Sequence, residues 1–421
     1  MGGAAGPVTN QGITRARARP DHPAGPAPLS DRPALPGRHP VARSSRGRHV
    51  RWRRASRETA TMRTDGEVRT RIRGAVTATL QAAGAPGAAI ALLVDGRPVL
   101  KEGLGHQDAA GTQALRDDGR FSLYSIAKTV LAVAALRLVE RGDLDLDGSV
   151  RSVLPNRPID PAVTFRQLLN HTGGLPDYGG LREYHAAVAA TPESPWSTDE
   201  FLARTLPVGP LFASGRGWAY SNVGYLLVRL AIERRTGLAL RAALADLVFR
   251  PAGLARTDVA VSLADAQDLT PGHATAPGGA AGLRVVTRHY HPGWVAHGLV
   301  TSTAPDVARF LEALVAGRLL GPEVLGAMMT PVPVPGSHRL FSPPTYGLGL
   351  MMAAESPLGR VVGHGGEGPG YSTAALYFPD LAGRRVTSVA LANRERHDLG
   401  LDLAFAAAGA VADALGRAAP A

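Results

Sequence analysis

The sequence predicts an α+β fold in which an antiparallel sheet is flanked by N- and C-terminal helices and joined to an all-helical lobe. Stretches of strand length lie near both ends of the chain, at residues 87–103 and 346–391. Between them, residues 143–293 read mainly as helices and long loops. A chain of 421 residues with 45% hydrophobic content is long enough to bury a large core. One sheet assembled from both ends of the chain is therefore expected.

The N-terminal elements follow from periodicity and turn residues. Residues 67–83 form an amphipathic pattern that ends at Gly84, which predicts a helix. Residues 87–94 and 97–103 read as strands joined by Asp95-Gly96, a strong signal for a two-residue hairpin. The apolar run 131–139 then predicts a buried helix that stops at Gly142.

The remaining elements are placed in the same way. In the insert we expect a capping box at residues 197–200, a helix over 225–234 and an exposed loop over 270–282. The C-terminal part predicts a helix from Thr303 to Gly317 and a closing helix over 399–415, with strands at 346–352, 360–362, 372–378 and 385–391. The predicted domain is 62–421, with its α/β part at 62–142 and 294–421 and its helical insert at 143–293.

Residues 1–61 are rich in proline, arginine, glycine and alanine and lack an apolar period, which predicts a disordered extension. Residues 1–62 contain 12 arginines and three acidic residues. The basic cluster at 48–54 is of a kind that touches nucleic acid or an anionic surface. We favour the simpler interpretation that Met62 is the first residue and that the upstream segment is an over-extended reading frame.

The rest of the chain is nearly neutral, with 34 basic and 32 acidic residues, so no nucleic acid partner is expected for the folded domain. No run approaches the roughly 18 apolar residues of a membrane span. Neither Met1 nor Met62 is followed by a secretory signal pattern, so we expect a cytoplasmic protein. The absence of cysteine excludes disulfides, thiolate metal ligands and a cysteine nucleophile.

The strongest chemical signal is Ser125-Ile-Ala-Lys128, which runs into the apolar helix. Residues three apart share a helix face, so the hydroxyl and the amine can meet. A buried lysine has a lowered pKa and can take the serine proton. The chain has only two lysines among its 46 basic residues, and arginine cannot lose its proton. The alternative is that Lys128 is an ordinary charge in the first turn of a helix.

Tyr220-Ser221-Asn222 stands just before another predicted helix. A phenol beside an ammonium has a lowered pKa and can pass a proton to a leaving group, and the amide can bind substrate. The alternative is that Tyr220 only packs and that Asn222 caps the helix.

His364-Gly365-Gly366 follows a short predicted strand, and its glycines let a substrate lie against the backbone, where a free N–H can stabilise an oxyanion. The alternative is a glycine-rich bend with an exposed histidine. His289, His291 and His297 have no carboxylate at ligand spacing, so we expect no metal.

Together these motifs resemble the serine β-lactamase-related family, which includes class C β-lactamases, D-alanyl-D-alanine carboxypeptidases, D-aminopeptidases and many esterases. The resemblance runs from about Gly87 to Asn393 and implies a β-lactamase/transpeptidase-like fold. Its landmarks are Ser125-Ile-Ala-Lys128, the segment 168–176, Tyr220-Ser-Asn222, the segments 298–303 and 346–349, and Gly363-His-Gly-Gly366.

The resemblance implies that Ser125 attacks a carbonyl and is acylated, with Lys128 and Tyr220 moving its proton. Which of the two is the general base stays open. Asn222 would bind the acyl amide of the substrate. The N–H groups of Ser125 and Glu367 would form the oxyanion hole. No cofactor is implied.

The third motif departs from the family's Lys-Thr-Gly, whose lysine and hydroxyl hold a carboxylate. Here it reads His364-Gly365-Gly366, a histidine is only partly charged near neutral pH, and Glu367 adds a negative charge. We therefore expect a serine hydrolase for small ester, amide or D-amino-acid peptide substrates that works through an acyl-enzyme at Ser125. Esterase or peptidase/amidase activity is favoured over efficient β-lactamase activity. The alternative is a non-catalytic penicillin-binding-like domain that recognises a peptide or a partner protein.

Overall fold

An eight-stranded antiparallel sheet forms the central layer, in the order β2-β1-β13-β12-β11-β10-β9-β8. The computed structural model describes residues 52–275 and 282–418, and the compact unit that contains the sheet spans Ala55–Ala421. The strands are β1 Gly87–Val94, β2 Arg97–Gly105, β8 Val332–Pro333, β9 Thr345–Tyr346, β10 Met351–Ala353, β11 Val361–Gly368, β12 Tyr371–Leu381 and β13 Arg384–Ala392.

The two ends of the chain meet in this sheet. Strand β1 pairs antiparallel with β13, with Ala88 opposite Ala392 and Val94 opposite Val386. Every residue of β1 except Leu93 is buried, because β1 is flanked by strands on both edges and by helices on both faces. The prediction of one sheet built from both ends of the chain is confirmed.

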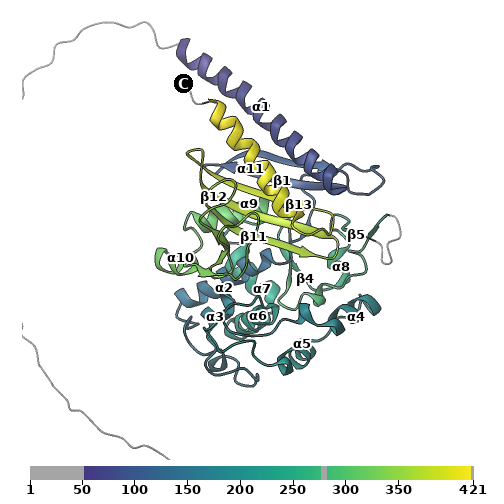
Figure 1. Cartoon of the computed structure of the whole chain (residues 1–421), viewed down its shortest axis with the longest axis vertical. Coiled ribbons are helices and arrows are strands. Elements are labelled where there is room, and N and C mark those ends of the chain that lie inside the picture. The colour runs from purple at the N-terminus through teal and green to yellow at the C-terminus, as the bar shows by residue number, and fades with distance from the viewer. Residues whose placement is uncertain (1–51, 276–281, 419–421) are drawn as a thin grey trace, which may run out of the picture. The chain divides into compact units, whose positions relative to one another are not determined.

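Two long helices cover one face of the sheet (Figure 1). They are α1, Trp52–Ala83, and α11, Leu399–Ala418, and both contribute to one apolar core with the sheet, α1 through Ile72 and α11 through Leu403. Helix α1 begins at Trp52, so the prediction of disorder is wrong for residues 52–61. Residues 1–51 lie outside the described part of the chain, and a start at Met62 stays a prediction.

Helix α11 qualifies the expectation about membrane spans, because its overall length and composition are those of a span although Asp402 and Asp413 interrupt its apolar residues. Among the described residues, Leu399–Gly416 meets that length and composition, with a mean hydropathy of 1.5. The helix packs on β12 and β13, and 56% of this window is buried inside the protein. A core helix of a folded domain has these same properties.

The other face of the sheet carries α2, Ile126–Glu140, and α9, Ala304–Val315. Twelve of the 15 residues of α2 are buried, because this helix lies between the sheet and the helical lobe. It packs on one side against β11 and β12 and on the other against α6, Asn222–Thr236. The first turn of α2, which holds the Ser-x-x-Lys motif, therefore lies where the two parts of the fold meet.

The lobe below α2 is mostly helical (Figure 1). Its helices are α3 Phe165–Leu169, α4 Arg182–Ala190, α5 Thr198–Thr205, α6, α7 Leu240–Leu244 and α8 Leu263–Ala266, and α10 Pro322–Met328 follows α9 in the chain. Single turns complete it at η1 Val150–Ser152, η2 Tyr178–Gly180, η3 Leu206–Val208, η4 Ala245–Phe249 and η6 Pro292–Trp294. The predicted capping box at Ser197 is present, with Glu200 as its partner.

The lobe is not all-helical, contrary to the prediction. Short strands β3 Phe121–Ser122, β7 Leu299–Ser302 and β4 Asp258–Ala260 form a second sheet. Strands β5 His273–Thr275 and β6 Leu283–Val285 form a hairpin where a loop was expected. Strands of two to four residues are too short to show an alternating pattern in the sequence, which is why pattern analysis missed them.

Strand β11 continues through the glycine-rich third motif, which was predicted to follow a strand. A Cβ on Gly363 would lie 2.0 Å from the Ala375 carbonyl oxygen, and one on Gly366 would lie 2.1 Å from the Leu123 carbonyl oxygen. Strand β10 pairs only with residues 361–363, so within the described chain one edge of β11 has no strand partner from His364 onward. Gly363 thus allows close packing against β12, and Gly366 lets the open-edged part of β11 approach the segment that leads into α2.

This close approach predicts that Gly366→Ala destabilises the protein. The added methyl group cannot fit beside the Leu123 carbonyl, so β11 or the start of α2 must move, at a cost of roughly 1–3 kcal/mol. Thermal unfolding followed by circular dichroism measures the effect. Gly365→Ala is the matched control, because its Cβ would make only ordinary contacts of 3.5 Å with Leu401. Equal melting temperatures for the two variants would contradict this interpretation.

Candidate active site

Ser125 stands at the N-terminal end of α2, directly after Tyr124. Tyr124 has a φ of 46°, a left-handed conformation that is uncommon for an aromatic residue. Its hydroxyl donates a 2.5 Å hydrogen bond to the Pro369 carbonyl, which ties this turn to the end of β11. The Ser125 Oγ lies 3.2 Å from the Lys128 Nζ and 2.8 Å from the Tyr220 Oη. The three residues predicted to act together are therefore in contact.

Lys128 is completely buried, and its amine faces three polar side-chain atoms. Besides Ser125, the Nζ donates to the Asn222 Oδ1 at 2.7 Å and lies 3.5 Å from the His297 Nε2. Burial lowers the pKa of Lys128 to about 7, and the negative charge of Asp177 partly opposes this shift. An amine with this pKa exchanges its proton near neutral pH, as a general base must. Lys128 does lie in the first turn of α2, but its complete burial and lowered pKa contradict the alternative of an ordinary charge there.

Tyr220 donates its phenolic proton to the Ser125 Oγ. Its ring lies 4.4 Å from the His171 ring and 4.7 Å from the Lys128 Nζ. We expected the neighbouring ammonium to lower the pKa of Tyr220, but burial raises it instead, and the bond to Ser125 offsets this only in part. Tyr220 is thus a neutral phenol at rest, and its position suits proton donation.

Asn222 is the first residue of α6 and links Lys128 to Asp177. Its backbone N–H and its Nδ2 donate to the two carboxylate oxygens of Asp177, at 2.8 and 3.2 Å. Ser221 is the helix cap, since its side chain accepts from the Gly224 N–H, so the alternative in which Asn222 caps the helix is wrong. A second N–H on Nδ2 is available to a substrate carbonyl.

Two residues that hold this arrangement come from the loop after α3. His171 accepts a hydrogen bond from the Ser221 N–H at its Nδ1, which braces this loop against the start of α6. Asp177 was not singled out in the sequence as a functional residue. It directly follows the landmark segment 168–176, and its contact with Asn222 joins residues 45 positions apart.

His364 corrects our expectation of a partly charged histidine. It is buried; its Nδ1 donates to the Gly365 carbonyl and its Nε2 lies 2.8 Å from the Tyr346 hydroxyl. Burial lowers the pKa of His364 to about 3, so the ring is neutral at physiological pH. A neutral ring that is hydrogen-bonded to a tyrosine attracts a substrate carboxylate even less than a partly charged histidine would.

Gly365, Gly366 and Glu367 form the open-edged part of β11. The Glu367 side chain accepts from the Asp398 N–H at 2.7 Å and lies 3.1 Å from the His397 Nδ1. Its charge is thus held by residues just before α11, rather than standing free beside the third motif as expected. The pairing of the Ser125 and Glu367 N–H groups as an oxyanion hole stays a prediction.

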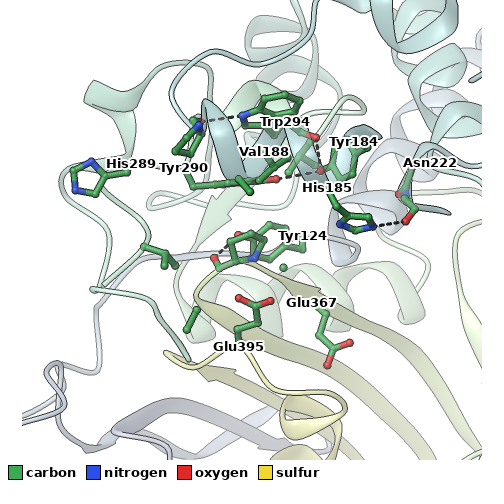
Figure 2. A pocket seen from close by; sticks show the side chains of 18 of the residues that line it. Tyr124, Tyr184, His185, Val188, Asn222, His289, Tyr290, Trp294, Glu367 and Glu395 are labelled. Atoms are coloured by element: carbon green, nitrogen blue, oxygen red, sulfur yellow. Dashed lines mark hydrogen bonds between the residues drawn. The ribbon is translucent and has the colours of Figure 1, made fainter. Parts of the chain in front are cut away.

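The serine opens into a cavity of about 770 Å³ (Figure 2). Ser125, Asn222, Glu367 and Gly368 all line it. Figure 2 shows an aromatic group on one side of the cavity and two carboxylates on the other; the group comprises Tyr184, Tyr290 and Trp294, and the carboxylates are those of Glu367 and Glu395. Glu193 and Arg284 also line the cavity, so its carboxylates outnumber its arginine.

The three histidines that the sequence offered as metal ligands have separate roles. His289 lies 3.7 Å from a Glu193 oxygen, and His291 caps η6 by accepting from the Gly293 N–H. His297 lies against Lys128. Within residues 52–275 and 282–418, no group of three or more potential ligands converges on one point.

Comparison with known proteins places this geometry in a family. A family model described as Beta-lactamase matches residues 72–411, which is most of the chain. The chain belongs to the beta-lactamase family. The match begins within α1 and ends within α11, so it includes the sheet, the lobe and the site between them.

Among similar proteins of this family, a penicillin-binding protein of Bacillus subtilis (strain 168) is 28% identical over 304 residues, 69% of this chain and 64% of that protein. Esterase EstB of Burkholderia gladioli is 31% identical over 259 residues, 55% of this chain and 66% of that protein. The chain spans less than two thirds of the length of each. The crystal structure of a D-stereospecific amidohydrolase from Streptomyces sp. is similar with a TM-score of 0.65 and 27% identity, covering 79% of this chain and 98% of that one.

These similarities confirm the predicted α+β fold of the β-lactamase/transpeptidase type and the membership of a family of serine hydrolases. The motifs that carried the resemblance converge at one point of the structure, around Ser125.

The environment of Lys128 predicts a pH dependence. If the neutral amine is the base, kcat/KM rises with pH and reaches half its plateau near pH 7. Because the Asp177 charge raises the pKa of Lys128, Asp177→Asn should move this acid limb to lower pH. Initial rates between pH 5 and 9 measure it. Asp147→Asn, which removes an exposed carboxylate paired with Arg166, is the matched control. If the acid limb of the pH profile of Asp177→Asn stays in place or moves to higher pH, the assignment of Lys128 as the base is contradicted.

Proposed function

We propose that this protein hydrolyses ester or amide bonds through an acyl-enzyme formed on Ser125. The observation that carries the proposal is that one serine oxygen contacts two groups whose pKa values are shifted in opposite directions. The Lys128 amine, 3.2 Å from Oγ, has a pKa lowered toward neutrality, and the Tyr220 phenol, 2.8 Å from Oγ, has a raised pKa. The first suits a proton acceptor and the second a proton donor.

The proposed sequence of steps conserves protons. Lys128 takes the hydroxyl proton as the Ser125 Oγ bonds to the substrate carbonyl carbon. When the tetrahedral intermediate collapses, the bond to the leaving oxygen or nitrogen breaks, and Tyr220 gives that atom its proton. The proton held by Lys128 then restores the phenol. Water attacks the acyl-enzyme in the second half, and the same groups return Ser125 to its hydroxyl form.

Asn222 suits the binding of the acyl part of the substrate. It lines the cavity next to Ser125, and its amide is held in a fixed orientation by Lys128 on one atom and Asp177 on the other. The N–H groups of Ser125 and Glu367 are the proposed oxyanion donors, since both residues line the same cavity and β11 has an open edge there.

The cavity favours uncharged or cationic substrates with an apolar acyl group. Tyr184, Tyr290 and Trp294 supply apolar contact area, while Glu367 and Glu395 disfavour an anion. The neutral, buried His364 cannot anchor a carboxylate by charge. The names of the similar esterase and D-stereospecific amidohydrolase support ester and amide substrates, including amides of D-amino acids.

Two variants test the mechanism. Wild-type protein should react with a fluorophosphonate probe at Ser125, and Ser125→Ala should lose both the adduct and all hydrolysis of p-nitrophenyl esters and D-amino-acid amides. Lys128→Arg keeps the charge but cannot lose a proton, so labelling should slow by about 10²–10⁴-fold. Mass spectrometry of the labelled peptide locates the adduct. A folded wild-type protein that forms no adduct would instead favour the non-catalytic, penicillin-binding-like recognition domain.

The third motif predicts weak β-lactamase activity. Penicillins and nitrocefin carry a carboxylate, for which the third motif offers the neutral His364 and a nearby Glu367 in place of the family's lysine. We expect kcat/KM for nitrocefin below about 10⁴ M⁻¹s⁻¹. The same preparation should be more efficient on a neutral p-nitrophenyl ester. A higher efficiency on nitrocefin than on the ester would contradict this view of the third motif.

A further inference from the structure

Among the described residues within hydrogen-bond reach of the Lys128 Nζ, His297 is the one that the proposed reaction steps leave without a role. It lies between η6 and β7, far in the chain from the three motifs, and only 3% of it is exposed. Its Nε2 lies 3.5 Å from the Lys128 Nζ, at the outer limit of a hydrogen bond. Gly298, which follows it with a φ of 102°, lets the chain turn back into β7 at this point.

The number of acceptors around Lys128 equals the number of N–H donors of an ammonium group. Such a group has three N–H donors, and the Nζ faces the Ser125 Oγ, the Asn222 Oδ1 and the His297 Nε2. A neutral amine has two N–H donors and one lone pair. When those two donors bond to Asn222 and His297, the lone pair points at Ser125.

The other orientation would prevent catalysis by Lys128. Without an acceptor at position 297, the second amine N–H turns to the Ser125 Oγ, which already accepts a proton from Tyr220. The lone pair then points away from the serine, and the amine cannot take its proton. The acceptor at position 297 therefore decides which face of the amine meets Ser125.

We infer that His297 is a positioning residue, whose Nε2 accepts an N–H of Lys128 and so directs the lysine lone pair at Ser125. This inference rests on the proposed function. It also decides between the two candidate bases, because Lys128 held in this way accepts the serine proton while Tyr220 donates to the same oxygen. The imidazole itself takes no proton in the reaction. For Nε2 to accept, the ring proton must sit on Nδ1, a buried atom that has no hydrogen-bond partner among the described residues.

Several titratable groups surround Lys128, and the imidazoles and phenols among them stay in one protonation state near neutral pH. Burial holds the pKa of the three buried imidazoles, those of His171, His297 and His364, below the ordinary value, with the positive charge of Lys128 as a further cause. The phenols of Tyr220 and Tyr225 have raised pKa values. Asp177 is the one carboxylate among the causes of the shift of Lys128, and burial raises the pKa of Asp177 itself. A change near pH 7 is assigned to the lysine because the pKa of Lys128 is about 7.

The rate of reaction with a fluorophosphonate probe, measured as a function of pH, tests the inference without knowledge of the substrate. In this step the Ser125 Oγ bonds to phosphorus, fluoride leaves and the serine proton goes to Lys128. His297→Leu should slow labelling about tenfold or more at pH 8, with little change in probe affinity. The acid limb of the pH profile of His297→Leu should move to lower pH. The charged form of Lys128 loses a hydrogen-bond acceptor in this variant, which lowers the pKa of the amine. His297→Gln, whose amide oxygen can accept the same N–H, should restore most of the rate.

The variants separate positioning from general loosening of the fold. If the His297→Leu substitution merely admitted water, the pKa of Lys128 would rise toward its ordinary value and the acid limb would move to higher pH. An upward shift, an unchanged limb, or a folded His297→Gln variant as slow as His297→Leu would each overturn the inference. His273→Gln is the matched control: this buried histidine contacts the Asn393 carbonyl, so the melting temperature should fall while the limb stays in place. Failure of the wild-type protein to label at Ser125 would instead refute the proposed function.

Discussion

The site depends on one costly feature, an amine buried completely between the sheet and the helical lobe. A fully buried ammonium is disfavoured unless polar groups surround it, and here each of its possible N–H donors has an acceptor. The same burial that opposes the charge brings the pKa of Lys128 to about 7. Burial therefore causes both the free-energy cost of the charged amine and its proposed reactivity. The fold has to supply the polar groups around the amine from several elements at once.

Each layer of the fold brings one part of that environment. Helix α2 carries Ser125 and Lys128, the start of α6 carries Asn222, and the turn before β7 carries His297. The backbone of β11 is pressed against the start of α2 because Gly366 has no side chain to keep it away. The geometry at the serine thus relies on packing between the sheet and the lobe rather than on any single loop.

The sequence was sufficient to predict features that depend on neighbouring residues or on a recurring motif. The i, i+3 relation of Ser125 and Lys128, the hairpin of β1 and β2, and the convergence of the three motifs were all predicted. Asp177 and His297 were not, because their contacts join residues 45 and 169 positions apart and no spacing rule indicates them. The pKa of Tyr220 was predicted in the wrong direction, since its burial is a tertiary property that outweighs the neighbouring amine.

The two lysines of the chain stand in different environments, and we expect only one of them to be replaceable by arginine. Lys101 lies at the surface, 3.3 Å from Asp117, where either basic side chain can form the same exposed ion pair. Lys128 needs a compact amine that can exist in neutral form, because a guanidinium would keep its charge and would not fit three acceptors grouped around one nitrogen. In a chain where 44 of 46 basic residues are arginine, the buried lysine marks the position where proton transfer, rather than positive charge, is required.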